Sequence, residues 1–508
     1  MKRRIRFLYN GALLTAVGLA IRGTQLLFGA YVARVLGADG VGINTLVMMV
    51  YAFALTFATS GISLTVTRLL ASAIGEGRGG ECGGIIRGAF VYATVFGSLA
   101  NLLLLILSGI LGGAVIGDGF SVTALRILSF SLIPSAFSAV ISGYFVAERR
   151  VTVNAISQVA GQIFRIAITV LLLTFVRGNA IVLLSLGVTL SEVFTLLIVL
   201  VTFAIDIRKR GKVSGISLSP VVGMALPLGI SAYLRSALIT LEHNLIPKSL
   251  IRHGDTREEA FSSYGYLHGM ALPFILYPMT PLTSFSGLLV PEFAEEKGRR
   301  DRAKMANIAT RAINTTLSYA IASSVLMLLF SSEFGYVLYG SGEAGKYIAM
   351  LAPVVPIMYL DHVADSILKG IGEHIYSMWV NIFDAVLSIA LVLILIPRIG
   401  IGGYAIVIIG METFNFILSV TRLRKRVAFR VDFLHAILLP AVCAIAAALL
   451  SRHLFSMPPD RTTPLWLILR VIFAICAYVA TRVTFSLAFT PFAKKHDVNN
   501  SLHTNPCK

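Results

Sequence analysis

The sequence predicts an all-α polytopic membrane protein of about fourteen transmembrane helices, with two six-helix lobes and an extra C-terminal helix pair. Three observations predict this class. Hydrophobic residues make up 56% of the 508 residues and charged residues only 13%, well below the charged share of an ordinary soluble domain. Apolar runs of about 20 residues, each long enough to cross about 30 Å of hydrocarbon, recur from end to end. An internal repeat relates the two halves of the chain.

The apolar runs between charged or Gly/Pro-rich breaks give the expected spans in order. The first run follows MKRRIR and continues past Arg22 to about Val32 without a clear cleavage site, so we expect an uncleaved helix rather than a signal peptide. The spans are expected near 10–32, 41–67, 86–113, 122–146, 153–176, 180–204, 219–246, 264–290, 306–330, 347–368, 375–397, 401–421, 433–452 and 464–489.

Basic residues cluster in alternate connections between these spans. The strongest clusters are MKRRIR (1–6), RKRGK (208–212), KGRRDRAK (297–304) and RLRKR (422–426). Because basic connections stay on the cytoplasmic side, we expect a multi-pass membrane protein with both termini in the cytoplasm. The net charge of +18 then serves topology, and no nucleic-acid partner is expected.

The internal repeat pairs residues 143–173 with residues 366–396. Polar positions coincide: Gln158 aligns with Asn381, Gly161 with Asp384 and Arg165 with Ser388, and a second alignment pairs Arg22 with Arg235. Such halves predict parallel repeats related by an axis along the membrane normal. We expect an N-terminal lobe, a basic cytoplasmic linker, a C-terminal lobe, helices 13 and 14 and a cytoplasmic tail at 1–207, 208–218, 219–430, 431–490 and 491–508.

Several basic and amide side chains fall inside the expected spans. An arginine at a helix centre costs about 2.5–3.5 kcal/mol, so Arg22 is expected either to face a cavity or to pair with one buried carboxylate. Four polar residues share one face of span five, which is typical of a wet lumen, although a single such amide would usually join two helices. In span seven, Arg235 and Glu242 also share a face, and they either bind substrate or pair with neighbours. The candidate substrate-binding residues are Arg22, Gln25, Asn154, Gln158, Gln162, Arg165, Arg235 and Glu242, with Arg34 at the outer mouth.

Acidic residues inside the spans form a second candidate set. They are expected either to bind a coupling sodium ion or proton, or to neutralise the arginines. These residues are Asp361, Asp365, Asp384, Glu192 and Glu412.

No other motif in the sequence predicts a catalytic, metal or cofactor site. GSGEAGKY (340–347) resembles a nucleotide-binding loop, but Tyr347 stands where that loop needs a magnesium-binding hydroxyl. The four cysteines are scattered, and the histidines lack the spacing of metal ligands. We therefore expect neither cofactor nor metal, and a transporter rather than an enzyme.

Four segments carry a resemblance to a known superfamily. LGADGVG (36–42), SGISLTVTRLLA (60–71), the GYF-x-A…SQ pattern (143–158) and the segment from Ala271 to Asp301 are similar to the multidrug/oligosaccharidyl-lipid/polysaccharide exporters. Within that superfamily, the chain most resembles the polysaccharide-biosynthesis and stage V sporulation protein B branch, with lipid II flippases close by. The chain departs from the branch at Gly161, where an acid is frequent, and at Glu148, where a small or amide residue is usual.

The resemblance implies two lobes around a cavity that opens alternately to each side of the membrane. Its oligosaccharide members move polyprenyl-pyrophosphate-linked sugars from the inner to the outer leaflet. Guanidinium groups suit a pyrophosphate, which favours this function for a chain with three intramembrane arginines. The alternatives are a sodium- or proton-coupled multidrug exporter and a non-transporting scaffold in envelope or spore assembly. The expected partners are a lipid-linked saccharide, membrane lipids and a coupling ion, and a monomer is expected.

Overall fold

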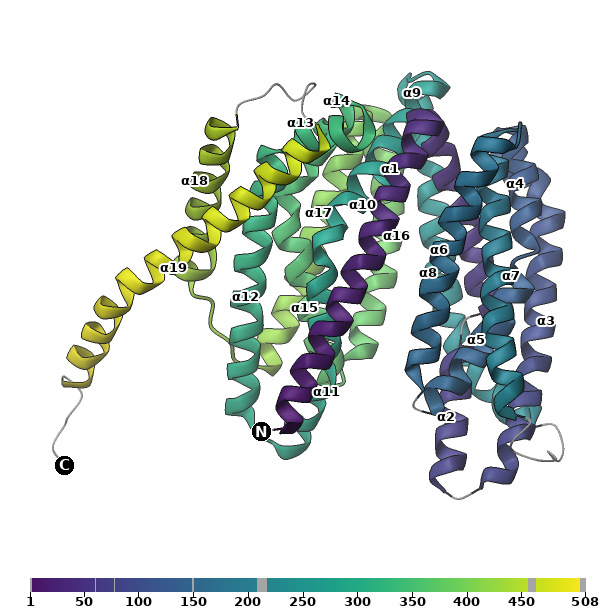
Figure 1. Cartoon of the computed structure of the whole chain (residues 1–508), viewed down its shortest axis with the longest axis horizontal. Coiled ribbons are helices and arrows are strands. Elements are labelled where there is room, and N and C mark those ends of the chain that lie inside the picture. The colour runs from purple at the N-terminus through teal and green to yellow at the C-terminus, as the bar shows by residue number, and fades with distance from the viewer. Residues whose placement is uncertain are drawn as a thin grey trace. The chain divides into compact units, whose positions relative to one another are not determined.

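The computed structural model describes residues 2–59, 61–76, 78–148, 150–207, 217–455 and 463–502 (Figure 1). Within these ranges the regular structure is helical and no strand is present. Most of the predicted basic linker (residues 208–216) and the end of the predicted tail (residues 503–508) lie outside the described residues. The α-helices are α1 Lys2–Thr59, α2 Ile62–Gly75, α3 Cys82–Ser108, α4 Gly119–Ser129, α5 Leu132–Ala147, α6 Val151–Phe175, α7 Ala180–Ile207, α8 Leu218–His253, α9 Arg257–Tyr264, α10 Leu272–Leu276, α11 Thr280–Arg299, α12 Arg302–Leu329, α13 Ser331–Phe334, α14 Gly342–Leu351, α15 Val355–Gly370, α16 His374–Ile399, α17 Ile401–Arg426, α18 Leu439–Leu454 and α19 Pro464–Leu502.

Short tightened or widened helical turns join several of these helices. Tightened 3₁₀ turns occur at η1 Gly79–Glu81, η5 Tyr277–Met279 and η7 Ala352–Val354. Widened π-helical turns occur at η2 Gly109–Ile116, η4 Gly265–Ala271, η6 Gly335–Tyr339 and η8 Leu434–Leu438.

The number of membrane-crossing segments agrees with the sequence prediction. In the described residues, 13 helical segments are long and apolar enough to cross a membrane, and the first of them, Gly18–Gly75, includes both α1 and α2. Helix α1 is itself two helices joined at Gly37, whose φ of 71° departs from helical geometry. The polytopic all-helical class is therefore confirmed.

Several predicted spans are broken rather than continuous. The expected span at 41–67 is interrupted at Gly61, which separates α1 from α2. The expected span at 264–290 is divided among η4, α10, η5 and α11, and Pro278 and Pro281 lie at its breaks. Proline removes a backbone donor and clashes with the preceding turn, which accounts for the breaks near Pro278 and Pro281. Hydropathy measures only the apolar character of a segment and therefore does not locate such breaks.

The chain forms two compact units. Unit 1 comprises Met1–Tyr31, Met270–Val380 and Ile408–Lys508, and unit 2 comprises Val32–Gly269 and Asn381–Val407. Each unit combines segments that are separated in the sequence. The unit boundaries fall inside α1, η4, α16 and α17, and each of these elements contributes residues to both units. The boundaries of the two six-helix lobes and of the C-terminal pair stay a prediction.

Each unit has its own apolar core. In unit 2, α2, α3, α5 and α8 contribute fully buried residues such as Ile62, Ala89, Tyr144 and Val221. In unit 1, α11, α12, α15 and α17 contribute Phe293, Ile313, Val363 and Leu423. Burial of these side chains stabilises each unit, while leucine, isoleucine and valine exposed on the outer helix faces match a lipid environment.

Residues in the family-like motifs occupy helix crossings in unit 2. A Cβ at Gly143 would lie 2.5 Å from the carbonyl oxygen of Ser63 on α2, so only glycine permits this approach. The neighbouring Tyr144 donates a hydrogen bond to Asp206 at the end of α7, and Arg150 forms an ion pair with the same carboxylate at 3.0 Å. The GYF motif therefore joins α5 to its neighbours.

Candidate functional site

The predicted site residues are divided between the two units, and each unit holds polar side chains within its membrane helices. Arg22, Gln25, Asp361, Asp365 and Glu412 belong to unit 1. The other predicted residues belong to unit 2: Arg34, Asn154, Gln158, Gln162, Arg165, Glu192, Arg235, Glu242 and Asp384.

In unit 2, Arg165 of α6 lies in a charge-balanced network. Its guanidinium interacts electrostatically with Glu192 of α7 and with Tyr51 of α1. Glu192 accepts a hydrogen bond from Ser135 at 2.9 Å, and the Tyr51 hydroxyl lies 2.7 Å from the Ser131 hydroxyl. Arg165 and Glu192 are therefore opposite charges that interact within this unit without a direct ion pair.

The predicted polar stripe on α6 does not act as one uniform surface. Asn154 donates a hydrogen bond to Ser142 on α5, Gln162 is half-buried, and only Gln158 is exposed. Gly161 lies on the face packed against α7, where a Cβ would approach Thr195 Oγ1 to 2.2 Å. Close packing of α6 on α7 thus explains a glycine at the position where an acid was the expected residue.

A second polar group in unit 2 joins α8 to α16. Glu242 accepts a hydrogen bond from Ser388 at 2.6 Å and interacts electrostatically with Asp384. Two carboxylates in one partly buried setting repel each other unless a cation or proton reduces their charge. Arg235, two turns earlier on α8, is exposed and has no ion-pair partner among the described residues.

Beside Glu242, a histidine–tyrosine cluster was missed at the sequence level. His243 Nδ1 lies 2.8 Å from the Tyr264 hydroxyl, His268 bonds to the Tyr404 hydroxyl, and the two imidazole rings lie 4.4 Å apart. The two histidines lie on α8 and η4 without the spacing of metal ligands, so no sequence signal marked the pair. The cluster joins α8, α9, η4 and α17.

In unit 1, the first half of α1 packs against the α10–α11 region through small residues. A Cβ at Gly18 would lie 3.5 Å from Thr280, and one at Gly23 would lie 3.3 Å from the Tyr277 hydroxyl. Between these glycines, Arg22 is exposed, as is Gln25 one turn later. Arg22 has no ion-pair partner among the described residues, and it interacts weakly with His362 of α15.

The acids of unit 1 differ in their surroundings. Asp365 forms an ion pair with Lys369 at 2.6 Å, one turn along α15. Asp361 lies beside Ser419 of α17, and Glu412 of α17 is half-buried. Asp365 is thus charge-balanced within its own helix.

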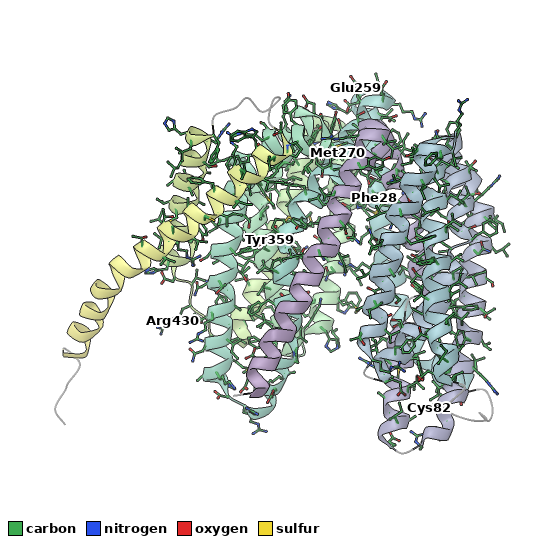
Figure 2. The ribbon with its side chains drawn as sticks, in the orientation of Figure 1. Phe28, Cys82, Glu259, Met270, Tyr359 and Arg430 are labelled. Atoms are coloured by element: carbon green, nitrogen blue, oxygen red, sulfur yellow. The ribbon has the colours of Figure 1, made fainter. Side chains whose placement is uncertain are left out.

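In the same unit Tyr359, labelled in Figure 2, is fully buried and donates a hydrogen bond to the Ile275 carbonyl at 2.6 Å.

Another ion pair, also missed at the sequence level, lies at the C-terminal helices. Arg470 of α19 is 2% exposed and lies 3.5 Å from Glu333 of α13, which is 1% exposed. Arg452 of α18 approaches the same carboxylate at 3.7 Å. The signal was available, because Arg470 interrupts the apolar run WLILRVIFAI (466–475).

Two family models match the chain. The model described as "Polysaccharide biosynthesis protein" matches residues 7–295, and the model described as "MatE" matches residues 267–394. The chain is 24% identical over 417 residues to stage V sporulation protein B of Bacillus subtilis (strain 168), which covers 79% of this chain and 80% of that protein.

Solved structures of transporters share the fold. A structure of the lipid II flippase MurJ in an inward closed conformation is similar with a TM-score of 0.70 and 15% identity, covering 96% of this chain and 99% of that one. An inward-facing multidrug resistance MATE family transporter of the MOP superfamily has a TM-score of 0.67 and 18% identity, covering 81% and 98%. At these identities the likeness concerns the fold.

Proposed function

Because the chain belongs to the polysaccharide biosynthesis protein family, within the multidrug/oligosaccharidyl-lipid/polysaccharide exporter superfamily, we propose that it is an alternating-access flippase. Its proposed substrate is a polyprenyl-pyrophosphate-linked saccharide, which moves from the inner to the outer leaflet of the bacterial plasma membrane. The similarity of the fold to a lipid II flippase over nearly the whole chain supports this class of substrate.

One observation carries the proposal. Arg22 and Arg235 lie inside apolar membrane helices with exposed side chains, and neither has an ion-pair partner in the described part of the chain. An arginine without a counter-charge is costly in hydrocarbon, so such residues mark a wet cavity or an anionic ligand. A pyrophosphate carries about two negative charges and accepts paired guanidinium hydrogen bonds. Arg165, by contrast, is half-buried and interacts electrostatically with Glu192, and it is proposed to shape the unit rather than bind substrate.

The test is a flipping assay with purified protein in liposomes that contain a polyprenyl-pyrophosphate saccharide. We expect Arg22→Ala and Arg235→Ala each to abolish flipping while the proteins express and fold normally. Arg177→Ala is the matched control, because Arg177 is an exposed arginine in the connection between α6 and α7. Full activity of Arg22→Ala or of Arg235→Ala would contradict the proposed role of that arginine.

Complementation identifies the substrate class. Rescue of a strain depleted of its lipid II flippase would assign a peptidoglycan precursor, whereas failure with intact flipping in liposomes would assign another polyprenyl-linked saccharide. Failure in both assays would favour the scaffold in envelope or spore assembly.

A cation-coupled multidrug exporter is the second candidate, because the MatE model matches residues 267–394, which hold Asp361, Asp365 and Asp384. Ethidium efflux by cells that express the wild-type chain would favour it. Exposed arginines inside the membrane helices disfavour cationic drugs as substrates, since like charges repel.

We propose that the coupling cation, sodium or a proton, binds at Glu242 and Asp384. These carboxylates interact with each other, and Glu242 accepts a hydrogen bond from Ser388. Asp365 forms an ion pair with Lys369 at 2.6 Å. Glu242→Gln and Asp384→Asn are expected to remove the dependence of transport on the ion gradient, and Asp365→Asn is the control. Unchanged gradient dependence in both variants would exclude this pair as the coupling site.

A further inference from the structure

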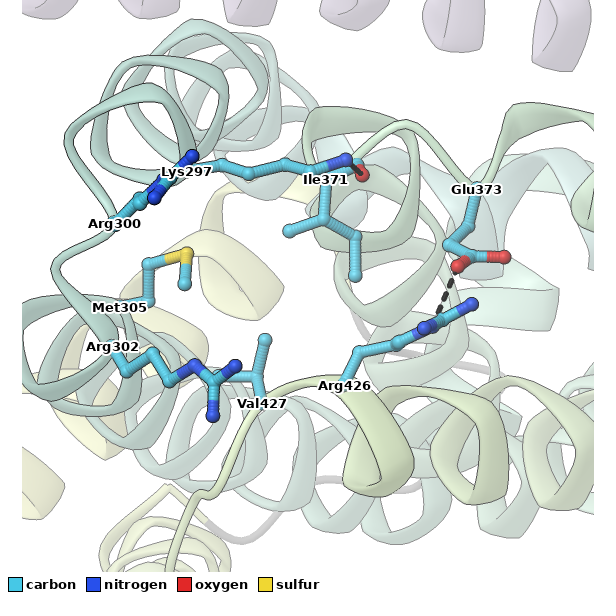
Figure 3. A pocket seen from close by; sticks show the side chains of 8 residues that line it. All are labelled: Lys297, Arg300, Arg302, Met305, Ile371, Glu373, Arg426 and Val427. Atoms are coloured by element: carbon cyan, nitrogen blue, oxygen red, sulfur yellow. Dashed lines mark hydrogen bonds and ion pairs between the residues drawn. The ribbon is translucent and has the colours of Figure 1, made fainter.

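A cavity of about 620 Å³ opens in unit 1 where several membrane helices end. We call it the basic pocket, and it is lined by Lys297, Arg300, Arg302, Met305, Ile371, Glu373, Arg426 and Val427 (Figure 3). Its residues come from the α11–α12 turn, the α15–α16 turn and the end of α17. The apolar segments Arg257–Arg299, Gly342–Gly370 and Ile401–Arg426 all end at this pocket, which places it at the level where spans leave the hydrocarbon. That is the level of lipid headgroups.

The lining of the basic pocket is strongly cationic. Glu373 is its single carboxylate, and this group is bound by Arg422 at 2.6 Å and by Arg426 at 2.7 Å. The hydrogen bond from Arg422, together with the positive charges of Arg422 and Arg426, lowers the pKa of Glu373 against the opposing effect of burial. Figure 3 shows Arg300 and Arg302 on the side of the pocket away from Glu373. The carboxylate therefore does not neutralise those two arginines.

Neighbouring basic residues of the same turn differ in their partners. Arg299 pairs with Glu295 at 2.6 Å, and Lys304 pairs with the buried Glu296 at 2.5 Å. Arg300 and Arg302, between them in sequence, have no ion-pair partner among the described residues. Arg299 and Lys304 are thus paired with carboxylates of the protein, whereas Arg300 and Arg302 line the pocket without an ion-pair partner.

The backbone of this turn holds the two arginines in place. Arg300 has a φ of 58°, a left-handed conformation that costs a non-glycine residue energy, and it is the one such residue among those described. Asp301 caps α12 by accepting a hydrogen bond from the Lys304 amide at 2.9 Å, which fixes the start of the helix that carries Arg302. Lys297 is held across the pocket by a hydrogen bond to the Ile371 carbonyl at 2.6 Å. The backbone at Arg300 and Arg302 and the ammonium group of Lys297 are therefore held in defined positions.

We propose that the basic pocket binds the phosphate group of a lipid headgroup. Guanidinium and ammonium groups without counter-charges recognise phosphate oxygens through charge-assisted hydrogen bonds. The buried Met305, Ile371 and Val427 add an apolar wall, which suits an amphiphile better than a free inorganic ion. The phosphate belongs either to an anionic glycerophospholipid or to the pyrophosphate of a polyprenyl carrier. Only the second source rests on the proposed function.

The experiment measures binding to the purified full-length chain in detergent by native mass spectrometry. The probes are phosphatidylglycerol, undecaprenyl pyrophosphate, inorganic pyrophosphate and, as the zwitterionic control, phosphatidylcholine. We expect the double variant Arg300→Gln/Arg302→Gln to weaken binding of the preferred phosphate probe about tenfold or more. Arg299→Gln removes one positive charge from the same turn, at an arginine that pairs with Glu295. This control is expected to change binding less than about twofold.

The variant Arg300→Gly distinguishes a loss of phosphate binding from a loss of protein stability. Glycine adopts the left-handed conformation without strain, so this variant is expected to raise the melting temperature while it weakens binding of the phosphate probe. Preference for phosphatidylglycerol would assign a leaflet lipid, preference for undecaprenyl pyrophosphate would assign the carrier, and equal binding of inorganic pyrophosphate would assign the phosphate alone. Equal loss in the Arg299→Gln variant, or binding of phosphatidylcholine as strong as that of the anionic probes, would overturn the proposal. Because flipping is not measured, failure here leaves the proposed function separately testable.

Discussion

Gly42 of α1 and Gly265 of η4 cross with their backbones in direct contact inside unit 2. A Cβ on Gly42 would lie 2.1 Å from the carbonyl oxygen of Phe261, and a Cβ on Gly265 would lie 2.1 Å from that of Ala38. Each methyl group would have to push backbone atoms, which cannot move aside as a side chain does. The last glycine of the LGADGVG motif is therefore a packing residue.

We predict that Gly42→Ala destabilises the protein by about 1–3 kcal/mol, the usual cost of overpacking a well-packed interior. Thermal unfolding in detergent measures the effect. Gly29→Ala on the same helix is the matched control, because a Cβ at Gly29 meets no atom within 4 Å, and it is expected to be neutral or slightly stabilising. Equal melting temperatures for Gly42→Ala and the wild type would contradict the prediction.

The sequence was sufficient to predict the fold class, because hydropathy and span length are properties of local sequence. It also identified the superfamily and a transporter rather than an enzyme, which the family match and the related structures confirm. The motifs behind that resemblance are informative for packing rather than for transport: Gly42 and Gly143 lie at helix crossings. Breaks inside spans, such as the one at Gly61, were not predicted, since they depend on which helices cross there.

The candidate site was less accessible to sequence reasoning. Periodicity placed Arg165 with three polar residues on one face of a helix, but only the packing of α6 on α7 reveals Glu192 as its counter-charge. His243 and His268 meet because α8 and η4 pack together beside Tyr404 of α17, so their spacing in the sequence carried no signal for them. Which helices pack against each other is a property of the tertiary structure. That packing decides which charged side chains inside the membrane lie beside an opposite charge.

The balance between Arg165 and Glu192 predicts a non-additive mutation pair. Arg165→Gln leaves a partly buried carboxylate without its counter-charge, and we expect it to lower stability by about 3 kcal/mol. Glu192→Gln is expected to cost a similar amount, whereas the double variant recovers most of the loss because no uncompensated charge remains. Thermal unfolding of the four proteins gives the coupling energy. Strict additivity of the two single changes would show that these residues do not pair.

The lowered pKa of Glu373 predicts an acid-dependent loss of stability. Its hydrogen bond with Arg422 is the main cause, and the group lies in the turn between α15 and α16, outside the membrane-crossing segments. A carboxyl whose folded pKa is depressed stabilises the fold above its unfolded value of 4.5 and loses that contribution as the pH falls below it. We expect the melting temperature of the wild type to fall more steeply below about pH 4.5 than that of Glu373→Gln. Parallel pH profiles would exclude Glu373 as a contributor.

The buried ion pair of Arg470 and Glu333 predicts that electrostatic attraction stabilises the packing of α18 and α19 against α13. Arg470 also lies over the Phe330 ring at 5.8 Å, and its carbonyl accepts a hydrogen bond from Ser451 of α18. Arg470→Met leaves Glu333 buried with only the more distant, partly exposed Arg452, so we expect a loss of about 3 kcal/mol. Adding Glu333→Gln should restore most of the lost stability, because the paired charges are then both absent.

Arg452→Met is the control and should cost less than about 1 kcal/mol, since its side chain is 43% exposed. Thermal unfolding in detergent measures all four proteins, and wild-type stability of Arg470→Met would show that apolar packing alone holds these helices.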